Sequence, residues 1–521
     1  MNLYRAFATV GGLTLLSRIL GFVRDILFAA IFGSGMVADA FNVAFRFPNL
    51  FRRLFGEGAF NSAFIPLFTQ ILERDGRQEA RHFAEEAMAG LVFVLLILSA
   101  ICMMGMPWLM YLLAPGFSND QVKFDLAVRL TQITFPYLLC MSLVALLSGI
   151  LNTFHRFVES SSISIILNTV LTLGLLVGFA LGYRNDATGG LIQAVAVTVA
   201  GVLQLTYLAW GAHRIGFSMR VRWPRMSKGV RRLIAQGIPG VVAGGVTQIN
   251  IVLGTMIASL QPGAVSQLYY ADRLYELPLA MVGIALGVVL LPEVSRHLAA
   301  GHAQAAMESQ NRSAELAMLL TVPAAVALMV IPGPIVSVFF ERGAFTKADT
   351  LATSLALAIF AAGLPSFVLI KVFSPAYFAR NDTKTPMLYA GISLTANTMG
   401  SIALFFLFRA HGILPQLGIA LATTFGGWIN TFLLWRTLVA RNQFVADRRL
   451  RRALPIIVLA SAVMGLMLFL IEQYLVSELL VDQSLLKRAA GLTILVVSGF
   501  ASYVSAVTGV GLMRTAASRQ T

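Results

Sequence analysis

Charged residues are scarce in this chain. Only 12% of its 521 residues are Asp, Glu, Lys or Arg, whereas 57% are hydrophobic and the mean hydropathy is +0.78. A soluble protein carries about a quarter charged residues, so this composition excludes a soluble globular fold. Apolar runs of roughly 20 residues recur along the chain, and each is long enough to cross a hydrocarbon core of ~30 Å as a helix. The sequence predicts an all-α polytopic membrane protein.

Sequence signatures of catalysis and of metal binding are also missing. None of the six lysines follows a glycine, which excludes the GxxxxGK[ST] phosphate loop of ATPases. The two cysteines, Cys102 and Cys140, stand apart in apolar runs, and there is no HExxH or paired-cysteine spacing. The longest connection, roughly 214–232, leaves no room for a soluble catalytic domain. We therefore expect a transporter without a cofactor or a metal, and not an enzyme.

Fourteen membrane spans are predicted from the apolar runs. Lysine and arginine concentrate in the N-terminus, the even-numbered connections and the C-terminus, and this bias places both termini in the cytoplasm. The net charge of +15 is mostly a topology signal, so we expect no nucleic-acid partner. The dense basic run 220–232 also suits contact with anionic lipid head groups. The spans lie at approximately 7–33, 37–70, 84–113, 124–153, 163–183, 191–213, 233–260, 266–295, 314–340, 348–378, 386–408, 415–438, 453–475 and 489–512.

An internal repeat divides the chain. Residues 135–168 align without gaps to 364–397, so that Asn168 falls on Asn397. Shorter matches of 116–118 to 344–346 and of Arg46 to Arg273 have nearly the same offset. Each copy holds six predicted spans, so both copies would insert in the same orientation. The repeat predicts two pseudo-symmetric six-helix lobes, 1–217 and 233–440, followed by two extra helices in 453–515.

Ionisable residues inside the spans are the main functional signal. A charge at bilayer depth costs from ~3 to more than 10 kcal/mol, so it persists where it faces water, a partner or a ligand. Arginine predominates among these residues, and guanidinium binds phosphate bidentately, so the predicted ligand is an anion. The alternative is that the charges pair with one another and only hold the spans together. The residues are Arg18, Arg24 and Asp25 in span 1, Asp39, Arg46, Arg52, Arg53 and Glu57 in span 2, Asp272, Arg273 and Glu276 in span 8, and Lys371 in span 10.

Four segments carry a resemblance to a known family. They are SRILGFVRD (17–25), ADAFNVAFRFPNLFRRLFGEGAF (38–60), FPYLLCMSLVALLSGILNTFHRF (135–157) and YYADRLYELPLAMVGIALGVVLLP (269–292). The chain resembles the MurJ (MviN) lipid II flippases of the MOP transporter superfamily over essentially its whole length. The resemblance implies two lobes around a cationic cavity, with an apolar groove for a lipid tail formed by the last two spans.

The resemblance also implies a substrate and a role for each residue. The implied substrate is lipid II, an undecaprenyl diphosphate bearing a disaccharide-pentapeptide, carried from the inner to the outer leaflet of the bacterial cytoplasmic membrane by alternating access for peptidoglycan synthesis. Membrane lipids and the cell-wall synthesis machinery are the other implied partners. Substrate binding is implied for Arg18, Arg24, Arg52 and Arg273, gating or arginine positioning for Asp39, Glu276, Asp25 and Asp272, and a secondary role for Arg46, Arg53 and Lys371.

Three other functions compete with this interpretation. A drug or metabolite exporter of the same superfamily would favour cations held by buried acids, whereas arginine predominates here. A flippase for another diphosphate lipid, such as an O-antigen unit, is disfavoured by the motifs in spans 1 and 2. A membrane glycosyltransferase would need a sizeable extracytoplasmic loop, and the outer loops are short. The energy source stays open between an ion gradient and the membrane potential, which is worth ~2.3 kcal/mol per charge per 100 mV.

Overall fold

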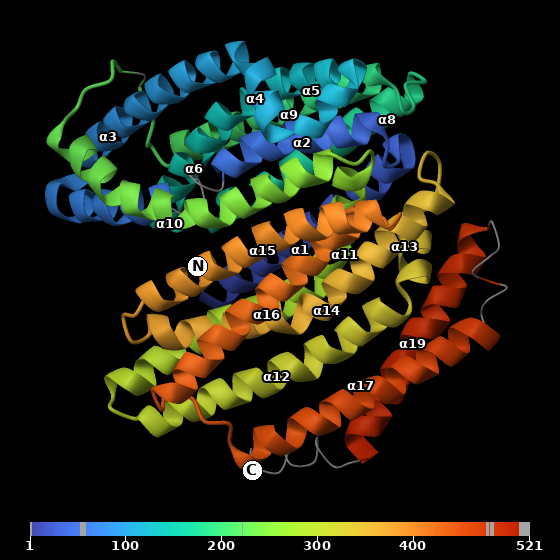
Figure 1. The fold of residues 1–521 in the computed structure, drawn as a ribbon. Coiled ribbons are helices and arrows are strands. Elements are labelled where there is room, and N and C mark those ends of the chain that lie inside the picture. The colour runs from blue at the N-terminus through green and yellow to red at the C-terminus, as the bar shows by residue number, and fades with distance from the viewer. Residues whose placement is uncertain (1–2, 53–58, 221, 476–478, 480–483, 510–521) are drawn as a thin grey trace. The chain divides into compact units, whose positions relative to one another are not determined.

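The computed structural model describes residues 3–52, 59–220, 222–475, 479 and 484–509. All regular elements in these residues are helices, which confirms the predicted all-α fold (Figure 1). The chain forms two compact units, one of Met1–Ser266 with Arg342–Phe345 and one of Gln267–Glu341 with Thr346–Thr521. This division differs from the predicted lobes, because the helix at 228–259 belongs to the first unit. The lobe boundaries remain a prediction from the repeat.

The first unit is built from ten α-helices and one short 3-10 helix among the described residues. An aromatic core joins α3, α6 and the turn after α9, where Phe64, Phe68 and Phe217 are fully buried and the rings of Phe68 and Phe217 meet edge to face at 5.6 Å. The elements are α1 (Leu3–Phe32), α2 (Met36–Arg52), α3 (Ala59–Met104), α4 (Met106–Leu113), η2 (Pro115–Asn119), α5 (Gln121–Thr134), α6 (Tyr137–Thr153), α7 (Phe157–Ser161), α8 (Ile163–Ala180), α9 (Ala187–Arg214) and α10 (Lys228–Ser259).

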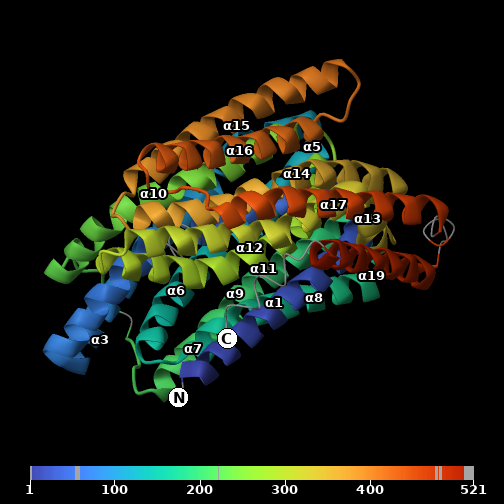
Figure 2. The same ribbon diagram turned by 90° about the horizontal axis from the view of Figure 1, so that it is seen from below.

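The second unit contains the remaining helices. Its core lies where α12, α14, α16 and α17 meet, and Tyr377 fixes α14 to α16 by donating its hydroxyl to the Leu434 carbonyl at 2.7 Å. The last two helices, α17 and α19, run side by side (Figures 1 and 2). The elements are α11 (Ala264–Ala299), α12 (Ala303–Val330), α13 (Pro332–Phe340), α14 (Lys347–Phe378), α15 (Lys384–Ala410), α16 (Gln416–Ala440), α17 (Arg448–Tyr474) and α19 (Leu485–Gly509).

Ten of the described helical segments are long and apolar enough to cross a membrane. They coincide with ten of the fourteen predicted spans. Helices α1, α2, α10 and α11 occupy the other four predicted spans but are not among the ten. Three of these, α1, α2 and α11, carry most of the ionisable residues singled out in the sequence, whereas Lys371 lies on α14, one of the ten. The fold is therefore confirmed as polytopic and helical, whereas the count of fourteen stays a prediction.

A polar cluster holds the start of α17 against α12. Glu315 on α12 is buried and accepts from Arg449 Nε at 3.0 Å, and it also pairs with Arg312. Asp447 precedes α17 and pairs with the same Arg312 guanidinium. Its backbone N–H donates to Asn311 Oδ1 at 3.1 Å. Two carboxylates and two guanidinium groups therefore neutralise each other where the extra pair of helices begins.

We expect the Glu315→Ala variant to lose roughly 2 kcal/mol of unfolding free energy, because two partly buried guanidinium groups lose their shared carboxylate. The measurement is thermal unfolding of the purified protein in detergent. Glu308→Ala is the matched control, since Glu308 is exposed on the same helix and should shift stability by less than about 0.5 kcal/mol. Equal losses in the two variants would show that the cluster does not stabilise the α12–α17 contact.

Candidate functional site

The described candidate residues lie on four helices, α1, α2, α11 and α14. In the first unit, Arg18, Arg24 and Asp25 lie on α1, and Asp39 and Arg46 lie on α2. In the second unit, Asp272, Arg273 and Glu276 lie on α11, and Lys371 lies on α14. Arg52 is the last residue of α2, but its side chain lies outside the description, as do Arg53 and Glu57 altogether.

Arg24 is buried, and all three of its side-chain nitrogens donate hydrogen bonds. Its Nε and Nη2 donate to Asp25 Oδ1 at 3.1 and 2.6 Å, and its Nη1 donates to Asn168 Oδ1 on α8 at 2.9 Å. Asn168 in turn donates its Nδ2 to the Ser17 carbonyl at 2.9 Å. Gly21 allows this approach, because a Cβ there would stand 3.2 Å from Asn168 Nδ2. In this conformation Arg24 has its charge neutralised and joins α1 to α8.

Arg18 differs from Arg24 although both lie on α1. Its side chain is exposed, and it makes no hydrogen bond or ion pair with the part of the chain that the structure describes. Its positive charge is therefore accessible on the surface of the first unit. The pairing of charges that could explain Arg24 and Asp25 as purely structural does not explain Arg18.

Asp39 is completely buried and accepts hydrogen bonds at both oxygens. Oδ2 accepts from Lys123 Nζ at 2.7 Å and from the Gly263 N–H at 2.8 Å. Oδ1 accepts from the Ser266 N–H at 3.0 Å and from its hydroxyl at 2.7 Å. A charged acceptor makes each of these bonds stronger than a neutral pair. The carboxylate thereby ties the start of α2 to the start of α5 and to the turn that leads into α11.

Sequence reasoning missed two partners in these networks. Lys123 lies one residue outside the predicted span 124–153, yet it is buried against the Phe117 ring, 4.2 Å from its centroid, with its ammonium on Asp39. Asn168 was singled out by the repeat, but its contact with Arg24 was not foreseen. The available signal for Asn168 was an amide inside an apolar span, where an unbonded polar group is costly.

Two hydrogen bonds donated by backbone N–H groups join the ends of helices in the first unit. The Gly116 N–H donates to Ser259 Oγ at the end of α10 at 3.1 Å, and the Ala344 N–H donates to the Ala30 carbonyl near the end of α1 at 2.8 Å. The predicted repeat matches 116–118 to 344–346 and span 1 to span 7, so the two contacts are reciprocal. A Cβ on Gly343 would lie 2.1 Å from the Ala30 oxygen, and its φ of +60° also favours glycine.

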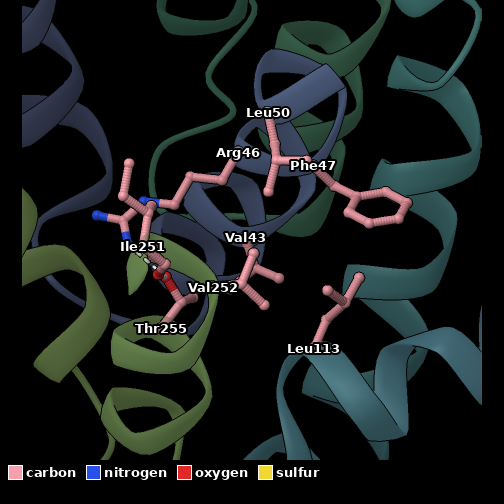
Figure 3. A pocket seen from close by; sticks show the side chains of 8 residues that line it. All are labelled: Val43, Arg46, Phe47, Leu50, Leu113, Ile251, Val252 and Thr255. Carbon is pink, nitrogen blue, oxygen red and sulfur yellow. Dashed lines mark hydrogen bonds between the residues drawn. The ribbon is translucent and has the colours of Figure 1, made fainter. Parts of the chain in front are cut away.

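Arg46 connects α2 to α10 next to a small cavity (Figure 3). Its Nη1 donates to Thr255 Oγ1 at 2.5 Å, and the Thr255 hydroxyl in turn donates a hydrogen bond to the Ile251 carbonyl at 2.7 Å. The cavity has a volume of ≈ 20 Å³ and is otherwise lined by apolar side chains such as Val43 and Leu113. That volume fits about one water molecule. Arg46 therefore bridges two helices here, and this cavity is too small for a head group.

The α11 candidates form a more exposed group in the second unit. Arg273 Nη1 lies 3.4 Å from Glu276 Oε2, the i,i+3 pair that the sequence predicts, and its Nη2 donates to the Tyr269 hydroxyl at 3.1 Å. Both charged side chains keep a third or more of their surface exposed. Lys371 reaches the same helix from α14, because a Cβ on Gly283 would meet its Nζ at 2.5 Å. The Arg273 side chain is 35% exposed and is therefore more accessible than that of Arg24, which is 9% exposed.

Comparisons with known proteins agree with one another. The family model described as "Lipid II flippase MurJ" matches residues 28–489. A Rhizobium tropici protein named "Probable lipid II flippase MurJ" is 46% identical over 466 residues, which is 89% of this chain and 86% of that protein. A solved structure titled "Lipid II flippase MurJ, inward closed conformation" is similar with a TM-score of 0.78 and 25% identity, covering 96% of this chain and 98% of the other. An inward-facing MATE transporter of the MOP superfamily shares the fold at a TM-score of 0.65 and 12% identity, covering 82% and 95%.

We expect Asp39→Asn to loosen the segment around Gly263 and Ser266, because the neutral amide binds their N–H groups more weakly and leaves Lys123 without a counter-charge. Hydrogen–deuterium exchange of peptides covering 262–268 should accelerate by about tenfold or more, as the loss of a charge-assisted bond of ~1.5–3 kcal/mol implies. The control is Asp125→Asn, which changes an exposed carboxylate on α5 that accepts a hydrogen bond from Gln121 Nε2 at 2.9 Å. Unchanged exchange in the Asp39 variant would contradict its assigned role.

Gly343→Ala should destabilise the protein by about 2 kcal/mol, because alanine is strained at this positive φ and its Cβ would collide with Ala30. Thermal unfolding in detergent measures the loss. Gly333→Ala provides the comparison, since nothing lies within 4 Å of a Cβ at that helical position, and its stability should stay level or rise slightly. If alanine is tolerated equally at both positions, the close approach of 343–344 to α1 is not required.

Proposed function

The chain belongs to the MurJ family of lipid II flippases, and we propose that it carries lipid II from the inner to the outer leaflet of the cytoplasmic membrane. The observation that carries this proposal is the match to the family model over residues 28–489, which spans both compact units. The physical requirement agrees with it. A polyisoprenoid tail can stay in the hydrocarbon, whereas a diphosphate head group cannot cross without replacement of its water.

Arginine side chains are the proposed ligands of the diphosphate. Arg18 is exposed, and the Arg273 side chain keeps about a third of its surface exposed beside Glu276, so both are accessible to a phosphate. Arg24 is bound to Asp25, and a diphosphate would compete with that carboxylate for the same bidentate face. In the absence of substrate, Asp25 and Glu276 then keep the arginines neutralised. Arg52 joins this set by the resemblance alone.

Asp39 is proposed to act as a lock and not as a substrate ligand. Its oxygens are fully occupied by Lys123, Gly263 and Ser266, so they have no capacity left for a head group. With both termini in the cytoplasm, as the lysine and arginine bias indicates, this cluster lies at the outer end of the first unit. The bonds of Asp39 would hold that end closed and would break when the carrier opens outward.

Energy for transport is proposed to come from outside the chain. A head group with net negative charge that moves outward runs down an inside-negative potential, worth ~2.3 kcal/mol per charge per 100 mV. An ion gradient is the alternative source. Delivery of lipid II to the outer leaflet would supply the polymerases that build peptidoglycan, which are the proposed functional partners.

Charge reversal tests the ligand role. Arg24→Glu and Arg273→Glu should each lower transport at least about tenfold, because each replaces a phosphate donor by a repelling carboxylate. The measurement is the accessibility of lipid II to an externally added probe in cells depleted of the native protein, with membrane insertion checked by immunoblotting. Arg409→Glu is the control, since Arg409 is exposed at the end of α15. Full complementation by both reversed proteins would refute the ligand role of these arginines.

A further inference from the structure

The first unit contains a second cavity that includes none of the candidate residues. Its volume is ≈ 380 Å³, within the range of small-molecule sites. Three helices line it, with Met88 from α3, Leu143 and Leu147 from α6, and Leu205 and Ala209 from α9. The turn that follows α9 closes one end. Because the lining is apolar except for His213 and Ser218, the body of the cavity suits a hydrocarbon chain.

One end of this cavity is polar. His213, the penultimate residue of α9, and Ser218 in the following turn both line it, and His213 Nδ1 lies 2.7 Å from Ser218 Oγ. Both side chains are exposed. The cavity is therefore amphipathic, with an apolar body between helices and a hydrogen-bonding mouth.

Aromatic side chains place the mouth at the membrane–water interface. Trp210 is half exposed, its ring lies 6.4 Å from that of Tyr207, and the Arg214 guanidinium lies 4.4 Å from its centroid. Tryptophan and tyrosine with a neighbouring cation are typical of the head-group level. Ala209 directly precedes Trp210, and His213 follows it by three residues. The mouth therefore lies at head-group depth, and the cavity body extends into the adjacent leaflet.

The surroundings of the mouth are positively charged. Arg77 and Arg81 of α3 donate to the carbonyls of Ile215 and Gly216 in the same turn, each at 2.7 Å. Arg214 and Arg220 flank the turn. Three acids nearby are engaged: Glu85 accepts from the Arg220 N–H and the Arg222 side chain, Glu86 faces His82, and Glu159 pairs with Arg156. Glu79 is exposed on α3 between Arg77 and Arg81, and the arginines outnumber it. The net field at the mouth therefore favours an anion.

We propose that this cavity binds an anionic diacyl phospholipid, with one acyl chain between α3, α6 and α9 and the phosphate at His213 and Arg214. Basic pockets between membrane helices on the cytoplasmic side are suited to anionic head groups. A guanidinium and an imidazole beside a hydroxyl supply donors to phosphate oxygens. The bound lipid would brace the α3–α6–α9 contact at the level of the inner leaflet. The proposal requires only that the unit sits in a membrane, so it stands apart from lipid II transport.

Native mass spectrometry of the full, delipidated chain tests the proposal. Phosphatidylglycerol and phosphatidylcholine with identical acyl chains are added separately, and the first bound lipid is quantified. We expect phosphatidylglycerol to bind at least tenfold more tightly, and inorganic phosphate at the same concentration not to displace it. Ala209→Phe, which fills the cavity, should weaken phosphatidylglycerol binding at least tenfold. Val199→Phe, at an exposed position of the same helix outside the cavity, should leave binding unchanged.

Arg214→Gln gives a second, independent test if Ala209→Phe does not fold. It should reduce the preference for phosphatidylglycerol over phosphatidylcholine severalfold, whereas Arg452→Gln, an exposed arginine near the start of α17, should preserve it. Equal binding of the two lipids, unchanged binding in Ala209→Phe, or equal effects of the two arginine variants would overturn the proposal. So would displacement of phosphatidylglycerol by a polyprenyl diphosphate at equimolar concentration, since the cavity would then be a substrate site.

Discussion

The need to give each buried charge a partner governs this structure. An ionisable side chain in an apolar helical fold is costly unless it is hydrogen-bonded or paired. Asp39 meets this need with donors from three parts of the first unit, and Arg24 meets it with Asp25 and Asn168. The same residues that carry the functional charge therefore also determine which helices contact each other. A charge that holds helices together can also bind a ligand, because a paired arginine can exchange its carboxylate for a phosphate.

The charged residues differ in how deeply they are buried, so the buried pairs and the exposed arginines are suited to different roles. Arg24 and Asp39 are buried in short bonds, whereas Arg18 is exposed and Arg273 is about a third exposed. Accessible guanidinium groups can meet a head group at little cost, while the buried pairs must first separate. Close backbone contacts at Gly116 and Gly343 add a rigid, non-titrating component to the first unit. Opening of this end would then need several bonds to break together.

The lipid-facing side of the first unit shows a different use of charge. Around the mouth of the larger cavity, arginines are placed beside tryptophan and backbone carbonyls, and the nearby acids are neutralised locally. This arrangement leaves a positive field at head-group depth without a buried unpaired charge. The bilayer thus acts both as the solvent that penalises charge in the helices and as the source of a ligand for charge at their ends.

Hydropathy and charge spacing were sufficient to predict the helical membrane fold, ten of the spans and the Arg273–Glu276 pair, because these depend on local sequence. A run of apolar residues needs a helix, and i,i+3 neighbours meet on it. They could not reveal that Lys123 reaches Asp39, that Asn168 holds Arg24, or that the turn after α9 closes an apolar cavity. Asp39 and Lys123 are 84 positions apart in the sequence, and Arg24 and Asn168 are 144 apart. Only the packing of helices brings such residues together. The division into compact units differs from the repeat for the same reason: a repeat records how the chain was patterned, whereas the contacts of α10 depend on which neighbours it packs against.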